Sequence, residues 1–404
     1  MKESYKVNIF KIFFNIIIVL IIIKLLFSYL SVKVHYFQTG FTSNFESFNF
    51  LGLPQDFSNK IEYLLLPLLL IFIFQYSKYF KYSKTFLIIS FCFYLLNIIT
   101  SIVNNTPFLE SLIFSLKIFT PIYFFNALII YHNKTGVSLK SILLKFIFIC
   151  LFLISLALLF FNTSLNRLQI YLPIYFDSIH THSYVLVSIF IALGYLIYRE
   201  HNRYFLFFYL VISFLFLYLG YNVRTAVIMY LIYMMVMLFL ISDIFKILIL
   251  KALVFLPLFT LLFLLTKWEI DWVDFSSGRI AMYEAKWNQL MNFGFFDWIF
   301  GQGPGSDLIK TDIWWWDKKG AHSDIITIIV ENGIIYLILF LLVYYFLIQL
   351  TSKGNIIFLA IIFGSLFSSL ISNGIVVRPH ANYVYYLVLA YIYTDLKSRR
   401  IDPT

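Results

Sequence analysis

The residues best suited to chemistry gather in one polar stretch, 267–322, of a chain that is otherwise apolar. Nine of the twenty acidic residues lie between Glu269 and Asp324. His322 stands where this stretch meets the next apolar run. Because an imidazole titrates near neutrality, it can take a proton from an attacking hydroxyl group. The pattern predicts that His322 is either a catalytic base or, as is common for a single histidine, a structural residue that caps a helix.

Four arginines add a second kind of chemistry. Arg167, Arg224, Arg279 and Arg378 fall in segments that begin, end or join apolar runs. A guanidinium stays charged and donates two parallel hydrogen bonds, which suits it to phosphate groups. One interpretation is that these arginines hold a lipid diphosphate. The alternative is that they contact lipid headgroups or pair with carboxylates of the polar stretch.

Two further residues are candidates for binding a substrate. Trp315, in the run Trp314–Trp316, suits either a sugar-binding groove or a membrane interface. Glu331 is the acidic residue placed deepest in an apolar run, and on a continuous helix it shares the face of Asp324 and points away from His322. We expect Glu331 to have a supporting role, and Glu331-Asn332-Gly333 to mark a helix break or a close helix contact.

Metal and cofactor chemistry has weak support in the sequence. His180 and His182 could bind a metal, but two ligands at that spacing are poor evidence, and His380 is a further isolated imidazole. No GxSxG, HExxH or phosphate-binding Gly-Lys-Ser motif occurs. We therefore predict neither a metal nor a cofactor.

Two local elements would position these groups. The pattern Ile280, Tyr283, Trp287, Leu290 predicts an amphipathic helix over 279–292 that lies on the membrane. The run Gly301–Gly305 then predicts a sharp turn.

The rest of the chain indicates a membrane protein. Hydrophobic residues make up 61% of the 404 positions, charged residues only 12%, and the mean hydropathy is +0.88. A spanning helix needs about twenty apolar residues. About twelve such segments are expected, near 9–30, 61–76, 85–103, 111–131, 141–162, 183–198, 204–220, 226–241, 247–266, 323–348, 356–375 and 383–396. The predicted fold is therefore an all-α integral membrane domain over 1–404, with 267–322 as its one large external loop.

The net charge of +10 follows from topology and does not indicate nucleic-acid binding. With twelve spans, sixteen cations fall on the side of both termini, as the positive-inside rule requires of the cytoplasm. The loop then faces the periplasm or exterior. Lys24, Lys117 and Lys251 lie nearer span interiors, where we expect structural roles.

Three patches together resemble the O-antigen ligase and polymerase superfamily. They are Tyr221–Ala226 with Arg224, the run Gly278–Glu284 with Arg279 followed by Gly301–Gly305, and His322-Ser323 followed by Glu331-Asn332-Gly333. Similarity covers 220–345, and the remainder resembles the superfamily in its layout of spans. The chain departs from the superfamily's pattern at Ser323, where asparagine is usual, and at Tyr336, where a second glycine is expected.

The resemblance implies a GT-C-type glycosyltransferase of the bacterial inner membrane that needs no metal or nucleotide. It implies that Arg224 and Arg279 hold an undecaprenyl diphosphate and that His322 is the base. On the chemistry of their side chains, we also expect Arg378, Arg167, Trp315 and Glu331 to contact substrate. The first expectation is an O-antigen polymerase, whose donor and acceptor are undecaprenyl-diphosphate-linked glycans and whose partner is a chain-length regulator (a co-polymerase). The alternatives are an O-antigen ligase that transfers polymer to lipid A core, and a polysaccharide flippase.

Overall fold

The computed structural model describes residues 2–30, 32–37, 43–48, 50–53, 57–160, 164–165, 171–172, 179–221, 223–241, 243, 245–247, 279–311, 318–350, 355–378 and 380–401. Helices dominate this part of the chain. In order, they are α1 (Lys2–Leu30), α2 (Phe57–Tyr76), α3 (Ser83–Val103), α4 (Phe108–Thr135), α5 (Lys140–Phe160), α6 (Ile179–Arg199), α7 (Arg203–Leu215), α8 (Arg224–Ile241), α11 (Arg279–Met291), α12 (Phe295–Phe300), α13 (Asp324–Gln349), α14 (Ile356–Ile371) and α15 (Ala381–Ile401).

Short elements join the helices. Among the described residues, β1 (Val32–Phe37) pairs with β2 (Ser43–Phe48) and β3 (Ser164–Leu165) pairs with β4 (Tyr171–Leu172), each as an antiparallel hairpin. Single turns of tighter or wider helix are η1 (Phe50–Gly52), η2 (Ser77–Tyr79), η4 (Phe216–Tyr221) and η5 (Ile375–Val377). The hairpins are small additions to a helical protein.

Within the described residues, seven helices are long and apolar enough to cross a membrane, which indicates a multi-pass membrane protein. The expected count of twelve is not reached. The predicted segments 111–131, 141–162, 356–375 and 383–396 do form helices, but these are not among the seven. One reason is length, because α14 has only 16 residues, below the roughly twenty that span a bilayer. The predicted span 247–266 lies outside the described residues.

The core of the bundle is built around α4 and α15. Ile118–Ile130 of α4 and Ala381–Ile392 of α15 are buried almost without interruption, and the two helices pack on each other. Outer helices instead expose large apolar side chains, such as Phe74, Phe91 and Phe208. A helix that is apolar on every face is suited either to a protein core or to lipid, and this bundle uses both environments.

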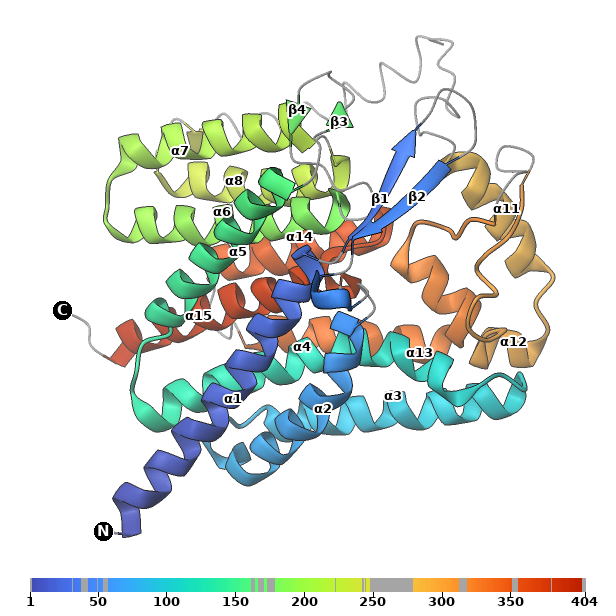
Figure 1. Cartoon of the computed structure of the whole chain (residues 1–404), viewed down its shortest axis with the longest axis horizontal. Helices are drawn as coiled ribbons and strands as arrows, with labels where there is room; N and C mark the ends of the chain where they lie inside the picture. Colours follow the sequence, from blue (N-terminus) through green and yellow to red (C-terminus); the bar gives the residue numbers. More distant parts are fainter. Residues whose placement is uncertain are drawn as a thin grey trace.

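The two ends of the bundle differ in chemistry. Both chain termini lie at one end, and α11 and α12 lie at the other (Figure 1). Near the termini, Lys78, Lys81 and Lys397 line one pocket, and the Nζ atom of Lys134 lies 4.0 Å from the ring centroid of Tyr76. Four of the sixteen cations that the sequence assigned to a single side therefore lie at this end.

Lys24 illustrates the structural role expected of charges within spans. Its Nζ atom lies 3.0 Å from Oε1 of Glu62, and both side chains are buried where α1 packs against α2. The same Nζ donates to the carbonyl of Ser58 at 2.9 Å. Paired and hydrogen-bonded in this way, the two charges can remain in an apolar interior.

Candidate active site

The site begins with a helix that breaks. Gly333, inside α13, has φ 81° and ψ 177°, a conformation that essentially only glycine adopts, so the first half of α13 ends there. The break expected at Glu331-Asn332-Gly333 is thus present. The freed carbonyls of Val330 and Glu331 accept hydrogen bonds from the backbone N–H groups of Gln302 (2.8 Å) and Gly303 (3.0 Å). The glycine-rich turn after α12 therefore caps the broken helix.

Two glycines allow this close approach. A Cβ atom on Gly333 would lie 2.1 Å from the carbonyl oxygen of Ile299, and one on Gly301 would lie 2.3 Å from the backbone nitrogen of Asn332. The turn is also tied to the end of α3, where Asn104 donates to the carbonyl of Gly301 at 3.1 Å. The expected turn at Gly301–Gly305 is a junction of three helices.

We predict that Gly333→Ala destabilises the protein by about 3 kcal/mol or more, because it adds a steric overlap to backbone strain. Gly305→Ala is the matched control. Gly305 also has a positive φ of 81°, but no atom lies within 4 Å of the position that a Cβ would take there. Thermal unfolding in detergent measures both. Equal losses of melting temperature in the two variants would show that the Gly333 contact has no importance of its own.

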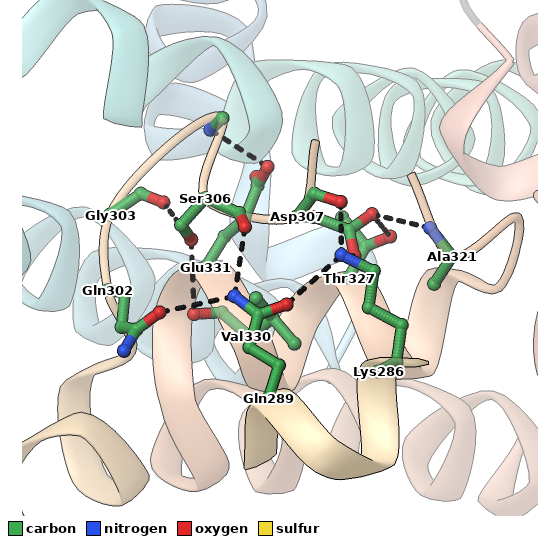
Figure 2. A network of polar contacts seen from close by, with 11 residues as sticks. Lys286, Gln289, Gln302, Gly303, Ser306, Asp307, Ala321, Thr327, Val330 and Glu331 are labelled. Carbon is green, nitrogen blue, oxygen red and sulfur yellow. Dashed lines mark hydrogen bonds and ion pairs between the residues drawn. The ribbon is translucent and has the colours of Figure 1, made fainter. Parts of the chain in front are cut away.

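A buried ion pair links the helix α11 to this junction. Lys286 of α11 and Asp307 are both buried, and Nζ of Lys286 lies 3.0 Å from Oδ1 of Asp307. The lysine also donates to the backbone carbonyl of Asp307 and to Oε1 of Gln289. The other carboxylate oxygen, Oδ2, accepts from the backbone of Ala321 (2.9 Å) and from the hydroxyl of Thr327 (2.7 Å) (Figure 2).

This network fixes the residue that precedes His322. Asp307 holds Ala321 on one side of the histidine, and on the other side the hydroxyl of Ser323 donates to the carbonyl of Leu370 at 2.8 Å. His322 itself has φ 52°, in the left-handed region that few residues other than glycine enter. Its neighbours are buried while its own side chain is exposed to a cavity.

We predict that Lys286→Met destabilises the protein by about 3–5 kcal/mol, because it leaves a buried carboxylate without its cation. The double variant Lys286→Met/Asp307→Leu should be more stable than Lys286→Met alone, since no uncompensated charge remains. It should nevertheless have little activity, because Ala321 and therefore His322 lose their anchor. A double-mutant cycle on thermal stability checks the first part. Strictly additive losses would contradict a coupled pair.

Cations surround the histidine. The cavity, of about 630 Å³, is lined by His322, Lys117, Lys318, Lys319 and Arg378, and also by the three acids Asp307, Asp324 and Glu331. The cavity walls remove part of the water around the imidazole, which lowers the pKa of His322. The charges of Arg279, Arg378 and Lys319 lower this pKa further, and Asp307 opposes them. His322 is therefore a neutral imidazole at pH 7, able to accept a proton.

The two arginines whose charges lower the pKa of His322 are held by backbone carbonyls. Arg279, at the start of α11, donates through Nη1 to the carbonyl of Ile371 (3.4 Å), which also accepts from the hydroxyl of Tyr283 (3.1 Å). Arg378 donates through Nη2 to the carbonyl of Asn373 (3.3 Å). Its Nε is buried and has no hydrogen-bond partner among the described residues. Arg378 thus presents an unused donor beside the cavity.

The three acids of the cavity hold backbone groups. Glu331 accepts from the N–H of Gly305 (2.9 Å) through Oε1, and Asp324 accepts from the N–H of Gly374 (2.7 Å) through Oδ2. Glu331 does share the cavity face with Asp324, as helical spacing predicted. The expectation that Glu331 points away from His322 assumed one continuous helix, but α13 begins only at Asp324, and both residues line the same cavity.

The remaining sequence candidates have separate positions. Arg224 starts α8 and is exposed. The hydroxyl of the adjacent Thr225 accepts a hydrogen bond from the hydroxyl of Tyr184, and the charge of Arg378 acts on that tyrosine. Arg167 and Trp315 lie outside the described residues. His182 is buried in the bundle and stacks on Tyr29. No group of three or more His, Cys, Asp or Glu side chains suited to a metal ion occurs in the described part of the chain.

Lys286, Asp307 and Lys117 belong to the site but were missed or misjudged from sequence. The predicted helix is confirmed as Arg279–Met291, yet it buries Met282, Lys286 and Leu290, while Ile280 and Trp287 face outward. The only sequence signal that Lys286 is buried is its spacing: it lies four residues after Met282 and four before Leu290, which places all three on one face of the helix.

Comparison with known proteins adds no assignment to this geometry: the chain matches no family model, and no curated protein is significantly similar to it in sequence.

Proposed function

We propose that the protein is a GT-C-type membrane glycosyltransferase that polymerises oligosaccharide units carried on undecaprenyl diphosphate, as an O-antigen polymerase does. The observation that carries the proposal is one cavity in which the imidazole of His322 lies among several cations. A lipid-linked donor needs cations for its diphosphate, and its acceptor needs a base for the attacking hydroxyl. The resemblance of residues 220–345 to the O-antigen ligase and polymerase superfamily is the reason for proposing a sugar polymer as the product.

The proposed reaction is a single displacement. The acceptor hydroxyl attacks the anomeric carbon of the donor glycan, and the bond from that carbon to the diphosphate oxygen breaks. The bonding electrons leave with undecaprenyl diphosphate, and the hydroxyl proton moves to Nδ1 or Nε2 of His322. Negative charge grows on the leaving group, so cations already in position stabilise the transition state more than the ground state.

The division of roles follows from which side chains are already engaged. Asp307, Asp324 and Glu331 all accept backbone hydrogen bonds, and Asp307 is also in an ion pair. His322 has an imidazole that lines the cavity and a pKa lowered from its ordinary value, which makes it the candidate base. Arg378 and Arg279, with Lys117, Lys318 and Lys319, form the candidate diphosphate site.

We further propose that the cavity faces the periplasm and that both termini are cytoplasmic, in the bacterial inner membrane, with about twelve spans. The positive-inside rule supports this orientation, because Lys78, Lys81, Lys134 and Lys397 lie at the end of the termini. Cysteine labelling in intact cells tests it. A cysteine at Lys310 that reacts only after permeabilisation would reverse the orientation and remove the proposed substrate from reach.

We predict an acid limb in the pH profile of transfer. The base must be unprotonated, and the pKa of His322 is lowered from its ordinary value of 6.5. Activity should therefore hold as pH falls to 6.5 and decline only below it, about tenfold per unit. Initial rates between pH 4.5 and 8 check this. A decline that begins above pH 7 would contradict a histidine with a lowered pKa.

Deletion of the gene tests the proposed function against its alternatives. Lipopolysaccharide that carries one repeat per core supports a polymerase. Accumulation of lipid-linked polymer with no transfer to core would instead identify a ligase, and accumulation of repeats in the inner leaflet would identify a flippase.

A further inference from the structure

A second cavity lies far from the candidate active site, at the end of the bundle that holds the termini. It is a groove of about 1040 Å³ between α1 and α5, closed on one side by the end of α4. Its walls are mostly apolar: Phe14, Ile18 and Ile22 from α1, and Leu144, Phe148 and Ile149 from α5. None of these residues contributes to the chemistry proposed above.

Polarity changes along the length of the groove. The polar residues of its lining are Asn15, Ser138, Lys140, Ser141 and Lys145. On α5, Lys140 and Ser141 come first, Leu144 and Lys145 follow one turn later, and Phe148 and Ile149 lie one turn deeper still. On α1, Asn15 likewise precedes Ile18 and Ile22. Both helices run inward from the end of the bundle that holds the termini (Figure 1), so the residues that come first on each helix lie nearer that end.

The polar end carries positive charge only. Among the described residues that line the groove, none is acidic, and no carboxylate of the described chain pairs with Lys140 or Lys145. From Lys140 to Ile149 the groove follows α5 for about 13 Å. A basic, hydrogen-bonding mouth above an apolar cleft of this length complements a molecule with an anionic head and a long apolar tail.

We propose that this groove binds an anionic phospholipid of the leaflet on the side of the termini. Its phosphate lies between Lys140 and Lys145, its glycerol region contacts Asn15, Ser138 and Ser141, and an acyl chain lies along Ile18, Ile22 and Phe148. Basic pockets between membrane helices bind anionic headgroups by this combination of contacts. The inference is independent of the proposed glycosyl transfer, because it concerns different residues at the opposite end of the bundle.

Native mass spectrometry of the full chain in detergent tests the proposal, with phosphatidylglycerol and phosphatidylethanolamine of identical acyl chains as probes. The wild-type protein should retain phosphatidylglycerol in preference. Lys140→Gln/Lys145→Gln should weaken that retention about 25-fold, or about five-fold for each lysine. The control Lys78→Gln/Lys81→Gln removes the same charge from the same end but outside the groove, and should retain the lipid as the wild type does.

A third variant tests the apolar part separately. Ile18→Trp fills the groove without a change of charge and should weaken binding of both lipids. Equal retention of the two lipids by the wild type would overturn the proposal without any variant. Retention by Lys140→Gln/Lys145→Gln that equals the wild type would also overturn it. An equal loss in the Lys78→Gln/Lys81→Gln control would overturn it too, because it would mean that the overall charge of this end attracts the lipid.

Discussion

His322→Asn should reduce polymer formation by about 10²- to 10⁴-fold while the protein remains folded, because an amide cannot act as a general base. The structure makes asparagine a favourable test. His322 has φ 52°, and asparagine enters the left-handed region more readily than most residues, so the backbone is not strained by the change. The loss should appear in initial rates with purified lipid-linked repeats at equal protein concentration.

His380→Asn is the matched control. His380 accepts or donates a hydrogen bond with the hydroxyl of Ser28 at 2.8 Å and does not line the cavity. The loss of its imidazole should therefore leave most transfer activity. If His322→Asn elongates chains at a rate near wild type, His322 is a structural residue, and the base must be sought among Asp324, Glu331 and His380.

Arg378→Lys should lower kcat/KM for the lipid-linked donor by about 10²-fold, with unchanged thermal stability. Lysine keeps the charge but lacks the planar guanidinium group. It therefore cannot both donate to the carbonyl of Asn373, as Nη2 does, and place a second donor where Nε lies. Because charge on the diphosphate increases during bond cleavage, the loss should fall on kcat as well as on KM. Arg279→Lys should behave in the same direction.

The control for this substitution is Arg199→Lys at the other end of the bundle. Arg199 pairs with Asp395 through Nε (2.8 Å) and Nη2 (3.2 Å), so the same chemical change is made in a structural ion pair. It should affect stability and leave kcat/KM unchanged. If Arg378→Lys has wild-type kinetics, Arg378 contributes only its positive charge or its influence on the membrane topology.

Local signals in the sequence predicted part of the site well. The boundary between polar and apolar residues located His322 next to the start of α13, and a glycine inside an apolar run located the break at Gly333. Most helices coincide with apolar runs because a membrane or a core demands them. Arg378 lines the same cavity as His322, and the charges of Arg279 and Arg378 both lower the pKa of the histidine.

The missing parts depend on contacts between distant segments. Lys286 and Asp307 are 21 residues apart, and nothing in either local sequence indicates that they pair. Lys117 was assigned a structural role because it falls in an apolar run, but it lines the cavity. The described residues contain seven helices long and apolar enough to span a membrane, fewer than the expected twelve, because apolarity alone does not separate a spanning helix from a shorter one such as α14.

Synthesis from purified components tests the central claim most directly. The wild-type protein is incubated with lipid-diphosphate-linked repeats as the sole substrate, and products and released undecaprenyl diphosphate are measured together. We predict chains of two or more repeats on one lipid, with one undecaprenyl diphosphate released for each new bond, and neither product with His322→Asn. Transfer that occurs only after lipid A core is added, or release of lipid diphosphate without chain growth, would contradict the proposal that this cavity polymerises its substrate.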